Sequence, residues 1–256
     1  MKEHPLRFAL RRRQLLALAG GVAMSSARAH DEAPALTSLK MATMDLPPYG
    51  WLDDKGGAHG ALYELCEEIG KRSGLPYVNK IQPFARMLES LKEGSIDMLS
   101  SQAHQQALDA GEKVAVMFSI NVIVATKKGS GIQTLDDLRG KKFVLHRSSS
   151  YKQLEGVPAD VQYVGSYEQA VDMLHTRPVH AAVFSEPAYY YFMQRAKLTR
   201  DDFGQVLYLE RNKEQWLFVR RGLPGATKDR LKTIVDQLRQ ENAFDNLMSK
   251  YGKPSA

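Results

Sequence analysis

Short apolar runs alternate with amphipathic helical patterns along most of the chain. Leu62, Leu65, Cys66 and Ile69 recur at helical spacing, which places them on one face of a helix over residues 61–71. Gly74 marks the end of that helix. Between such helices lie brief runs that are typical of buried strands. The pattern predicts strands over residues 39–44, 77–81, 96–99, 142–146, 161–164, 180–184 and 216–220, with a further β-rich run within 114–126.

The remaining helices are predicted from their apolar faces and their first residues. Thr134 with Asp137, and Ser166 with Gln169, have the spacing of side chains that cap a helix start. Residues 151–154 are read as the opening of another helix. The predicted helices cover residues 84–91, 166–174, 186–195, 228–242 and 244–252.

Alternating strands and helices call for sheets covered by helices, so the fold class is α/β. Two such sets meet near residues 124–128, which indicates two lobes. The final helices are expected to return to the first lobe, giving two crossovers, a hinge and an interlobe cleft. The prediction assigns residues 30–38 to a flexible N-terminus, 39–125 and 221–256 to lobe 1, and 126–220 to lobe 2.

The first residues have the layout of an export signal. A basic segment ending in Arg12 and Arg13 precedes ten uncharged residues, 15–24, which are too few to span a bilayer. Small residues then flank Arg28, as at a signal peptidase site. We expect a twin-arginine signal peptide over residues 1–29, cleaved near Ala29, and a periplasmic product. The alternative is an amphipathic N-terminal anchor helix.

The export signal changes the meaning of the net charge. The chain has 35 Lys and Arg and 29 Asp and Glu, a formal charge of +6. Six of those bases and one of those acids lie in residues 1–29, so 29 bases and 28 acids remain, a net charge of +1. The basic character belongs mainly to the segment that is removed, which argues against a nucleic-acid partner.

Other composition signals exclude several classes of function. No later apolar run reaches the ~18 residues of a membrane span, so a soluble mature protein is expected. Cys66 is the only cysteine, which excludes an intramolecular disulfide, and its apolar neighbours favour a buried thiol over a reactive one. Common hydrolase, metalloprotease and phosphate-loop motifs are absent from the sequence. No cofactor and no metal site are indicated; His30 with Asp31 is the one weak metal candidate.

Several longer stretches resemble the extracellular solute-binding proteins of family 3, the receptors of polar amino-acid ABC transporters. The resemblance covers residues 39–252, and its order and spacing agree throughout. It is carried by PPYGWLDDKGGAHGALYELCEEIGKRSG, LESLKEGSIDML, KKGSGIQTLDDLRGKKFVL, SYEQAVDMLHTRPVHAAVFSEPA and AFDNLMSKYG. The resemblance implies the two-lobed type II periplasmic-binding-protein fold with two hinge strands and closure on a small-molecule ligand. It also implies a monomeric, non-enzymatic receptor whose partner is an inner-membrane ABC permease.

The sequence departs from that family at both charged ligand-binding positions. Members that bind amino acids usually have an arginine soon after the strand ending near residue 99, yet residues 98–112 contain no Arg or Lys. The second-lobe aspartate that usually holds the ligand ammonium is replaced by Ser185. A buried ligand carboxylate without a counter-charge costs several kcal/mol. An ordinary α-amino acid is therefore disfavoured as ligand.

Two arginines are candidates for the missing positive charge. Arg86 opens a predicted helix on the cleft side of the first lobe, although an ion pair with Glu89 is an equal possibility. Arg147 precedes Ser148, Ser149, Ser150 and Tyr151, where the family has a turn at a helix N-terminus that suits an anion. The alternative is that these serines only cap a helix.

Aromatic and polar side chains complete the predicted ligand-binding site. Tyr49, Trp51 and Phe84 are expected to form pocket walls, with core packing as the alternative for Tyr49 and Phe84. First-lobe hydrogen bonds are expected from the loop after the strand at 96–99, and second-lobe contacts from the residues that open the helix at 186. These residues are Ser101, Gln102, His104, Ser185 and Glu186.

The leading hypothesis is a periplasmic receptor for a small polar or aromatic solute. Two alternatives are compatible with the same sequence. One is a ligand-sensing subunit of a signalling or redox system. The other is a periplasmic enzyme on the same fold, similar to cyclohexadienyl dehydratase, for which Glu186 is the one candidate acid.

Overall fold

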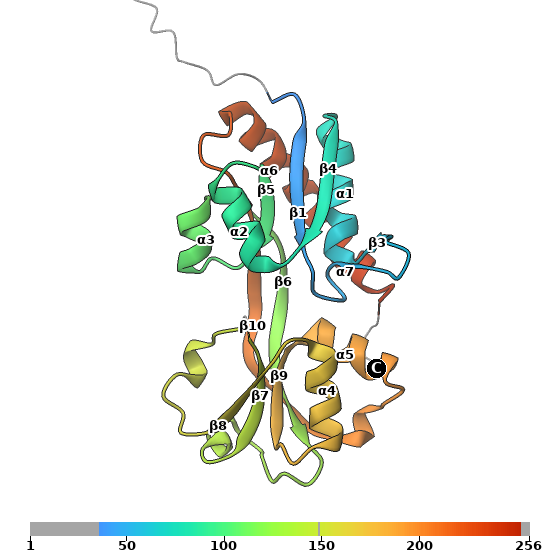
Figure 1. Cartoon of the computed structure of the whole chain (residues 1–256), viewed down its shortest axis with the longest axis vertical. Coiled ribbons are helices and arrows are strands. Elements are labelled where there is room, and N and C mark those ends of the chain that lie inside the picture. The colour runs from blue at the N-terminus through green and yellow to red at the C-terminus, as the bar shows by residue number, and fades with distance from the viewer. Residues whose placement is uncertain (1–35, 148, 252–256) are drawn as a thin grey trace, which may run out of the picture. The chain divides into compact units, whose positions relative to one another are not determined.

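The predicted alternation of strands and helices is confirmed in a computed structural model, which describes residues 36–147 and 149–251 (Figure 1). The predicted signal peptide and cleavage site, residues 1–29, therefore lie outside the described residues, as do His30, Asp31 and Ser148. The first half of the described chain contains β1 (Leu39–Met44), β2 (Trp51–Leu52), β3 (Ala58–His59), α1 (Ala61–Ser73), β4 (Tyr77–Gln82), α2 (Phe84–Lys92), β5 (Met98–Ser101), α3 (Gln105–Ala110) and β6 (Glu112–Lys127).

The second half continues the alternation and ends in two helices. It contains the 3-10 turns η1 (Leu135–Leu138), η2 (Lys152–Leu154) and η3 (Arg200–Asp202). The other elements are β7 (Lys142–His146), β8 (Asp160–Val164), α4 (Tyr167–Thr176), β9 (Ala181–Ser185), α5 (Glu186–Arg195), β10 (Phe203–Val219), α6 (Gly225–Gln240) and α7 (Ala243–Met248).

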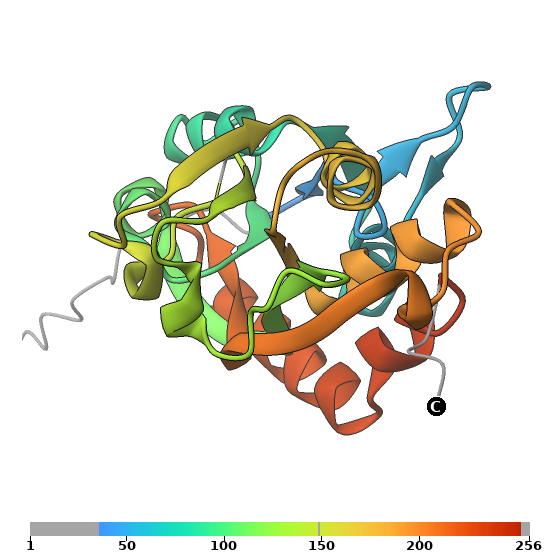
Figure 2. The same ribbon diagram turned by 90° about the horizontal axis from the view of Figure 1, so that it is seen from below.

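Two long strands connect the two lobes of this α/β fold. The strands form an eight-stranded sheet in the order β4-β1-β5-β10-β6-β9-β7-β8. β6 has 16 residues and β10 has 17, and the two pair with each other in antiparallel direction. At about 3.3 Å per residue each is roughly 50 Å long. One half of each strand belongs to the lobe of β1, β4 and β5. The other half belongs to the lobe of β7, β8 and β9 (Figures 1 and 2).

The apolar cores divide along these two strands. β6 contributes Ile120 to the core beneath α1, α6 and α7, whereas Val122 and Ile123 belong to cores around β7 and β9. On β10, Leu209 packs in the second set and Leu217 in the first. The described residues fall within one compact unit. The domain boundaries at 125/126 and 220/221 stay predictions; they lie within β6 and just after β10.

Local signals in the sequence explain most element boundaries. β1, β7 and α5 have the predicted bounds. Gly74 ends α1 with φ 65°, a left-handed conformation that suits glycine. Ser166 caps α4 by accepting a hydrogen bond from Gln169 N, and Thr134 with Asp137 forms a capping box.

Three predicted elements differ from the structure. The strand at 216–220 is the end of β10, which begins at Phe203; the positive φ of Asn212 and several register shifts interrupt its alternation. The capping box at Thr134 opens only a 3-10 turn. The prediction that a helix opens at residue 151 is wrong, because only the three-residue turn η2 forms there. A short helix, α3, follows β5 where a loop was expected.

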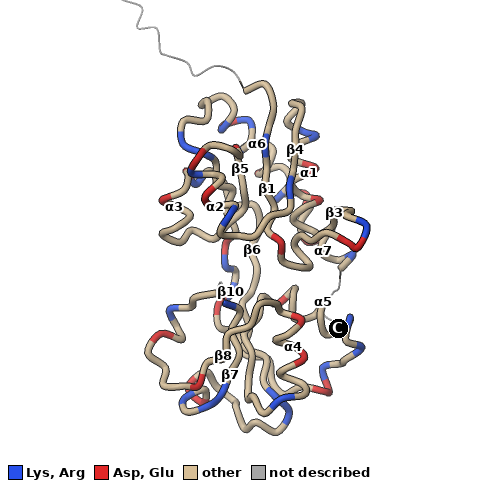
Figure 3. The backbone as a smooth tube through the Cα atoms, in the orientation of Figure 1, with Lys and Arg blue, Asp and Glu red and all other residues tan. Residues whose placement is uncertain are grey.

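Cys66 confirms the predicted buried thiol. It is 1% exposed and free, and burial raises the pKa of the thiol to about 12, so it stays protonated at physiological pH. Acidic and basic residues occur along both lobes of the described chain (Figure 3). Within the described residues, no helix combines the length and apolar character that crossing a membrane requires.

Candidate functional site

A cleft of about 1320 Å³ lies between the two lobes, beside the hinge strands β6 and β10. Its walls come from the carboxyl ends of β1, β5, β7 and β9, the edge of a sheet at which α/β proteins usually bind ligands. Phe118, Ile120 and Val122 of β6 form its back. The volume exceeds the ~300–1,000 Å³ of typical small-molecule sites. A small solute would therefore be enclosed only if the lobes closed further.

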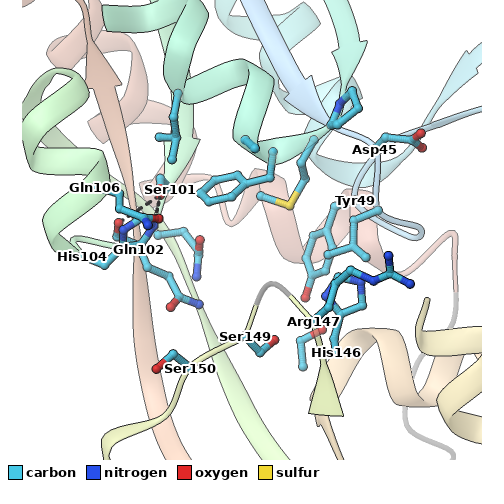
Figure 4. Close-up of a pocket in the computed structure, with 18 of the residues that line it drawn as sticks. Asp45, Tyr49, Ser101, Gln102, His104, Gln106, His146, Arg147, Ser149 and Ser150 are labelled. Carbon is cyan, nitrogen blue, oxygen red and sulfur yellow. Dashed lines mark hydrogen bonds between the residues drawn. The ribbon is translucent and has the colours of Figure 1, made fainter. Parts of the chain in front are cut away.

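Tyr49 projects into the cleft from the turn after β1 (Figure 4). The Tyr49 carbonyl accepts hydrogen bonds from Leu62 N and Tyr63 N at 3.0 Å, which fixes the turn on the start of α1. Gly60 permits this approach, since a Cβ there would lie 2.3 Å from the Tyr49 carbonyl oxygen. The Tyr49 ring is 4% exposed and stacks on Phe244. Tyr49 is thus both a core residue and a wall of the cleft.

Phe84 and His104 form the neighbouring part of the first-lobe wall. Their rings meet edge to face with centroids 5.7 Å apart. His104 caps α3: its Nδ1 accepts a hydrogen bond from Ala107 N, so the neutral ring carries its proton on Nε2, 3.4 Å from Ser101 Oγ. Ser101 in turn donates to the Gln102 carbonyl. Burial, and to a lesser extent the Lys213 charge, lower the pKa of His104. His104 and Ser101 both line the cleft, but their polar groups are used in hydrogen bonds within the loop between β5 and α3.

The second-lobe wall begins where β7 ends. Arg147, Ser149 and Ser150 follow the strand and line the cleft, with Tyr151 next to them. Arg147 is exposed, and its guanidinium lies over Gly165, where a Cβ would come within 2.7 Å of a guanidinium nitrogen. Because η2 is a single 3-10 turn, no α-helix dipole supports anion binding here. Any anion would depend on Arg147 and the serine hydroxyls.

His146 and Tyr167 are cleft residues that the sequence reasoning missed. His146 is 8% exposed, and its Nε2 lies 3.0 Å from the Gly165 carbonyl, to which it donates. Burial lowers the pKa of His146; the hydrogen bond to the Gly165 carbonyl offsets part of this, and the Arg147 charge lowers the pKa further. The rings of His146 and Tyr167 are 5.3 Å apart. His146 was detectable as the last residue of a predicted strand, at the edge where ligands bind; Tyr167 gave no comparable signal.

Two buried hydroxyls in the cleft lack hydrogen-bond partners. Tyr49 and Ser185 are each 4% exposed, and among the described residues neither Tyr49 Oη nor Ser185 Oγ has a partner with hydrogen-bonding geometry. Burial raises the pKa of the Tyr49 phenol, and the nearby Ser185 hydroxyl offsets this by a smaller amount. Buried polar atoms without partners are rare in folded proteins. They are therefore the strongest candidates for contacts to a solute.

Three predicted site residues lie outside the cleft. Trp51, in the short β2–β3 hairpin, packs against His59, Tyr191 and Tyr251. Arg86 is exposed on α2 and does not line the cleft. Glu186 accepts hydrogen bonds from Asn121 and from Tyr208, which belong to the two hinge strands. The hairpin turns Trp51 away from Tyr49, and the helical turn of α2 separates Arg86 from Phe84.

Charged side chains in the cleft lie at its rim. The charged residues that line it are all exposed: Asp45, Glu89, Lys92, Asp109 and Arg147. The buried part of the wall, among the described residues, consists of apolar, hydroxyl and amide groups together with His146. No cluster of three or more metal-binding side chains occurs in the described part of the chain. The interior of the cleft is suited to uncharged polar and aromatic groups.

Comparisons with known proteins agree with this geometry. The family model of bacterial extracellular solute-binding proteins, family 3, matches residues 39–254. A "Probable histidine-binding protein" of Campylobacter jejuni subsp. jejuni is 30% identical over 120 residues, which make up 44% of this chain and 46% of that protein. The match thus spans less than half the length of this curated relative.

Solved structures share the fold at low sequence identity. An ancestral arginine-binding protein bound to arginine has a TM-score of 0.67 and 18% identity, covering 84% of this chain and 98% of that one. The ancestral amino acid-binding protein AncCDT-1, a precursor of cyclohexadienyl dehydratase, also has a TM-score of 0.67, with 16% identity over 85% of this chain and 96% of that one. At these identities the likeness concerns the fold alone.

Proposed function

Because the chain belongs to the bacterial extracellular solute-binding proteins, family 3, we propose that it captures a small polar or aromatic solute between its lobes. It then delivers the solute to an ABC permease in the inner membrane. The proposed site of action is the periplasm, reached after removal of residues 1–29, and the receptor acts as a monomer. The observation that carries the proposal is the cleft whose walls come from both lobes.

The position of the cleft gives the receptor its mechanism. A solute that contacts Tyr49 and Phe84 on one side and Arg147, Ser149 and Ser185 on the other makes its full set of contacts only when the lobes approach. The solute therefore favours the closed arrangement by its differential affinity for the two states. Since β6 and β10 carry both crossovers, they are the segments that bend.

The uncharged interior of the cleft limits the class of solute. A zwitterionic α-amino acid presents a carboxylate and an ammonium, and each needs a counter-charge once it is desolvated. Arg147 can serve the carboxylate, but the carboxylates that line the cleft are at its exposed rim. The relative named for histidine supports an amino-acid-like size. We infer a polar or aromatic solute other than an ordinary α-amino acid.

The enzymatic alternative loses its candidate acid. Glu186 lies outside the cleft wall, and both of its carboxylate oxygens accept hydrogen bonds from hinge-strand side chains. A general acid must come within hydrogen-bonding reach of the substrate. Nothing in the described cleft therefore favours a dehydratase over a receptor.

A thermal-shift screen of the exported, purified protein tests the proposal. The panel contains amino acids, amines, organic acids and aromatic solutes, each at saturating concentration. A solute that binds the folded state raises the melting temperature by mass action. Failure of every member to raise it would contradict the receptor proposal, and strong stabilisation by standard amino acids would contradict the inferred solute class.

Uptake measurements separate a transport receptor from a sensor. Cells that lack the chain should lose uptake of the identified solute and regain it when the chain is restored. Normal uptake in the deletion strain, together with a lost transcriptional or redox response to the solute, would instead identify a sensing subunit. Turnover of prephenate-like substrates by the purified protein would identify an enzyme.

A further inference from the structure

We propose that the hydroxyls of Tyr49 and Ser185 form a subsite that binds an uncharged hydrogen-bonding group of the solute, such as a hydroxyl or carboxamide, and rejects an ammonium group. This inference rests on the proposed function, because it names the chemical class of solute that the interlobe cleft accepts. It goes further by assigning that selection to two residues, one from each lobe.

The two hydroxyls come from opposite sides of the cleft. Tyr49 follows β1, and Figure 4 shows its hydroxyl directed toward the segment that carries His146, Arg147 and Ser149. Ser185 is the last residue of β9. Tyr49 and Ser185 are each 4% exposed, yet neither oxygen has a hydrogen-bond partner with suitable geometry among the described residues. The two hydroxyls lie close to each other, so a group of the solute within reach of both oxygens would bond both lobes at once.

Further hydroxyls surround this pair. Burial raises the pKa of the Tyr167 phenol, and the hydroxyls of Ser149, Tyr151 and Ser185 lie close enough to offset part of that rise. Each hydroxyl can donate one hydrogen bond and accept others. The subsite therefore matches groups that both donate and accept, which describes an alcohol or a carboxamide.

No carboxylate of the described cleft wall lies in its buried part, and Glu210, whose charge reaches Tyr151, lies outside that wall and is ion-paired with Lys213. Burial raises the pKa values of the phenols of Tyr49, Tyr151 and Tyr167, so these side chains are uncharged at physiological pH. The carboxylates that line the described cleft, on Asp45, Glu89 and Asp109, are exposed at its rim. A buried ammonium would lose its hydration without gaining a counter-charge. A neutral group would lose less and would satisfy both hydroxyls.

Matched pairs of solutes test the selection. Each pair consists of an α-amino acid and the α-hydroxy acid of the same carbon skeleton: phenylalanine and 3-phenyllactate, histidine and imidazolelactate, leucine and 2-hydroxy-4-methylpentanoate, and glutamine and its α-hydroxy analogue. Within a pair, a hydroxyl replaces the ammonium while the carboxylate and side chain stay the same. Thermal shift finds the pairs that bind, and calorimetry then gives the dissociation constants. We expect the α-hydroxy acid to bind at least about 10-fold more tightly.

Variants assign the preference to the two hydroxyls. Tyr49→Phe and Ser185→Ala should each weaken binding of the α-hydroxy acid about 3- to 10-fold, the effect of losing one neutral hydrogen bond. Ser185→Asp places a carboxylate in the subsite and should reverse the preference within the pair. Tyr163→Phe removes an exposed phenol, 65% exposed on β8, and should leave both constants unchanged. The unliganded melting temperature of each variant confirms folding, and the two conservative variants suffice if Ser185→Asp does not fold.

The outcomes distinguish the inference from the proposed function. Equal or tighter binding of the α-amino acids overturns the inference and leaves the receptor proposal intact. Unchanged α-hydroxy-acid affinity in Tyr49→Phe and Ser185→Ala also overturns it, because another group then holds the hydroxyl. Failure of this panel and of the wider solute screen contradicts the proposed function, and the inference with it.

Discussion

Ser185 and Glu186 are neighbours in the chain, but the polar atoms of the buried Ser185 and the partly buried Glu186 differ in their hydrogen bonding. Ser185 ends β9 in the cleft, and its hydroxyl has no partner with hydrogen-bonding geometry among the described residues. Glu186 opens α5 and is bonded through both oxygens: Asn121 donates to one at 2.7 Å and Tyr208 to the other at 3.3 Å. Asn121 also accepts from Asn212 N at 3.0 Å. This hinge network ties α5 to β6 and β10.

This difference in hydrogen bonding separates positions that stabilise the fold from positions proposed to bind a solute. A paired polar group contributes to stability, and removing one partner leaves the other unsatisfied. An unpaired buried group costs free energy in the unliganded protein, so its removal is neutral or stabilising there but weakens binding. Asn121 lies where β6 passes from one core to the other, so the hinge network holds the crossover.

Asp97 should give the largest loss of stability, because it is the most completely paired buried carboxylate of the described chain. It is 4% exposed; its oxygens accept from Arg220 Nε at 2.7 Å and Lys40 N at 2.8 Å, which ties β1 to the end of β10. Asp97→Ala should lower the free energy of unfolding by about 2–4 kcal/mol, below the value for a fully buried pair because Arg220 is a quarter exposed. Urea denaturation measures the change.

Asp54→Ala is the matched control. Asp54 is exposed, and the structure describes no partner for its side chain, so its removal should change the free energy of unfolding by less than about 0.5 kcal/mol. Equal effects of the two substitutions would show that pairing does not account for the stability at Asp97.

Glu186→Ala should give the next largest loss. It leaves Asn121 and Tyr208 without their shared acceptor, and we expect a loss of about 1–2 kcal/mol in the free energy of unfolding. Glu155→Ala, at an exposed carboxylate with no described side-chain hydrogen bond, is the control. If Glu186→Ala instead left stability unchanged and abolished solute binding, Glu186 would belong to the cleft and the contrast with Ser185 would be wrong.

Much of the fold was predictable because its signals are local. The apolar runs of β1 and β7 and the start of α5 fixed those elements with correct bounds. The full length of β10 could not be predicted, because its middle residues are polar and Asn212 interrupts the alternation. Its pairing with β6 is a contact between distant segments, which no local pattern records. The family resemblance supplied the two-lobed arrangement that local patterns only indicated.

The site was predictable by segment but not by side chain. Tyr49 and Trp51 are two residues apart, yet the Leu46–Gly50 bridge and the β2–β3 hairpin place one in the cleft and the other beside Tyr191. Glu186 has partners 65 and 22 residues away, so its role in the hinge could not be read from its position at a helix start. Direction within a turn and long-range pairing are properties of the folded chain.

Tyr251 and Tyr49 allow a direct comparison between a hydroxyl that has hydrogen-bond partners and one that has none described. Tyr251 donates to Glu64 and accepts from Gly60 N at 3.3 Å, whereas Tyr49 Oη has no described partner with hydrogen-bonding geometry. Tyr251→Phe should lower the free energy of unfolding by about 1 kcal/mol. Tyr49→Phe should leave it unchanged or raise it by a few tenths of a kcal/mol, at about the same ring volume. Equal losses would mean that Tyr49 is paired in the unliganded protein, and the subsite would lose its basis.

The smallest expected effect is a dependence of stability on pH from the two cleft histidines. Burial lowers the pKa values of His104 and His146 below the unfolded value of about 6.5. As pH falls below about 7, the unfolded chain therefore binds more protons than the folded chain. The stabilisation is fully present above the unfolded pKa and is lost as pH falls toward the folded values. The melting temperature should therefore decrease steadily as the pH is lowered from 7.5 to 5.5.

His104→Asn isolates the contribution of one ring. Asparagine is a good N-cap residue, so it can replace the hydrogen bond from Ala107 N to the His104 ring without titrating. The variant should keep its stability at pH 7.5 and lose less of it at pH 5.5 than the unsubstituted protein. The paired carboxylates titrate in a more acidic range, since bonding lowers the pKa values of Glu64, Glu112 and Glu241. An unchanged slope in His104→Asn would assign the dependence to His146 or to groups outside the cleft, and would show that the His104 cap does not depend on a neutral ring.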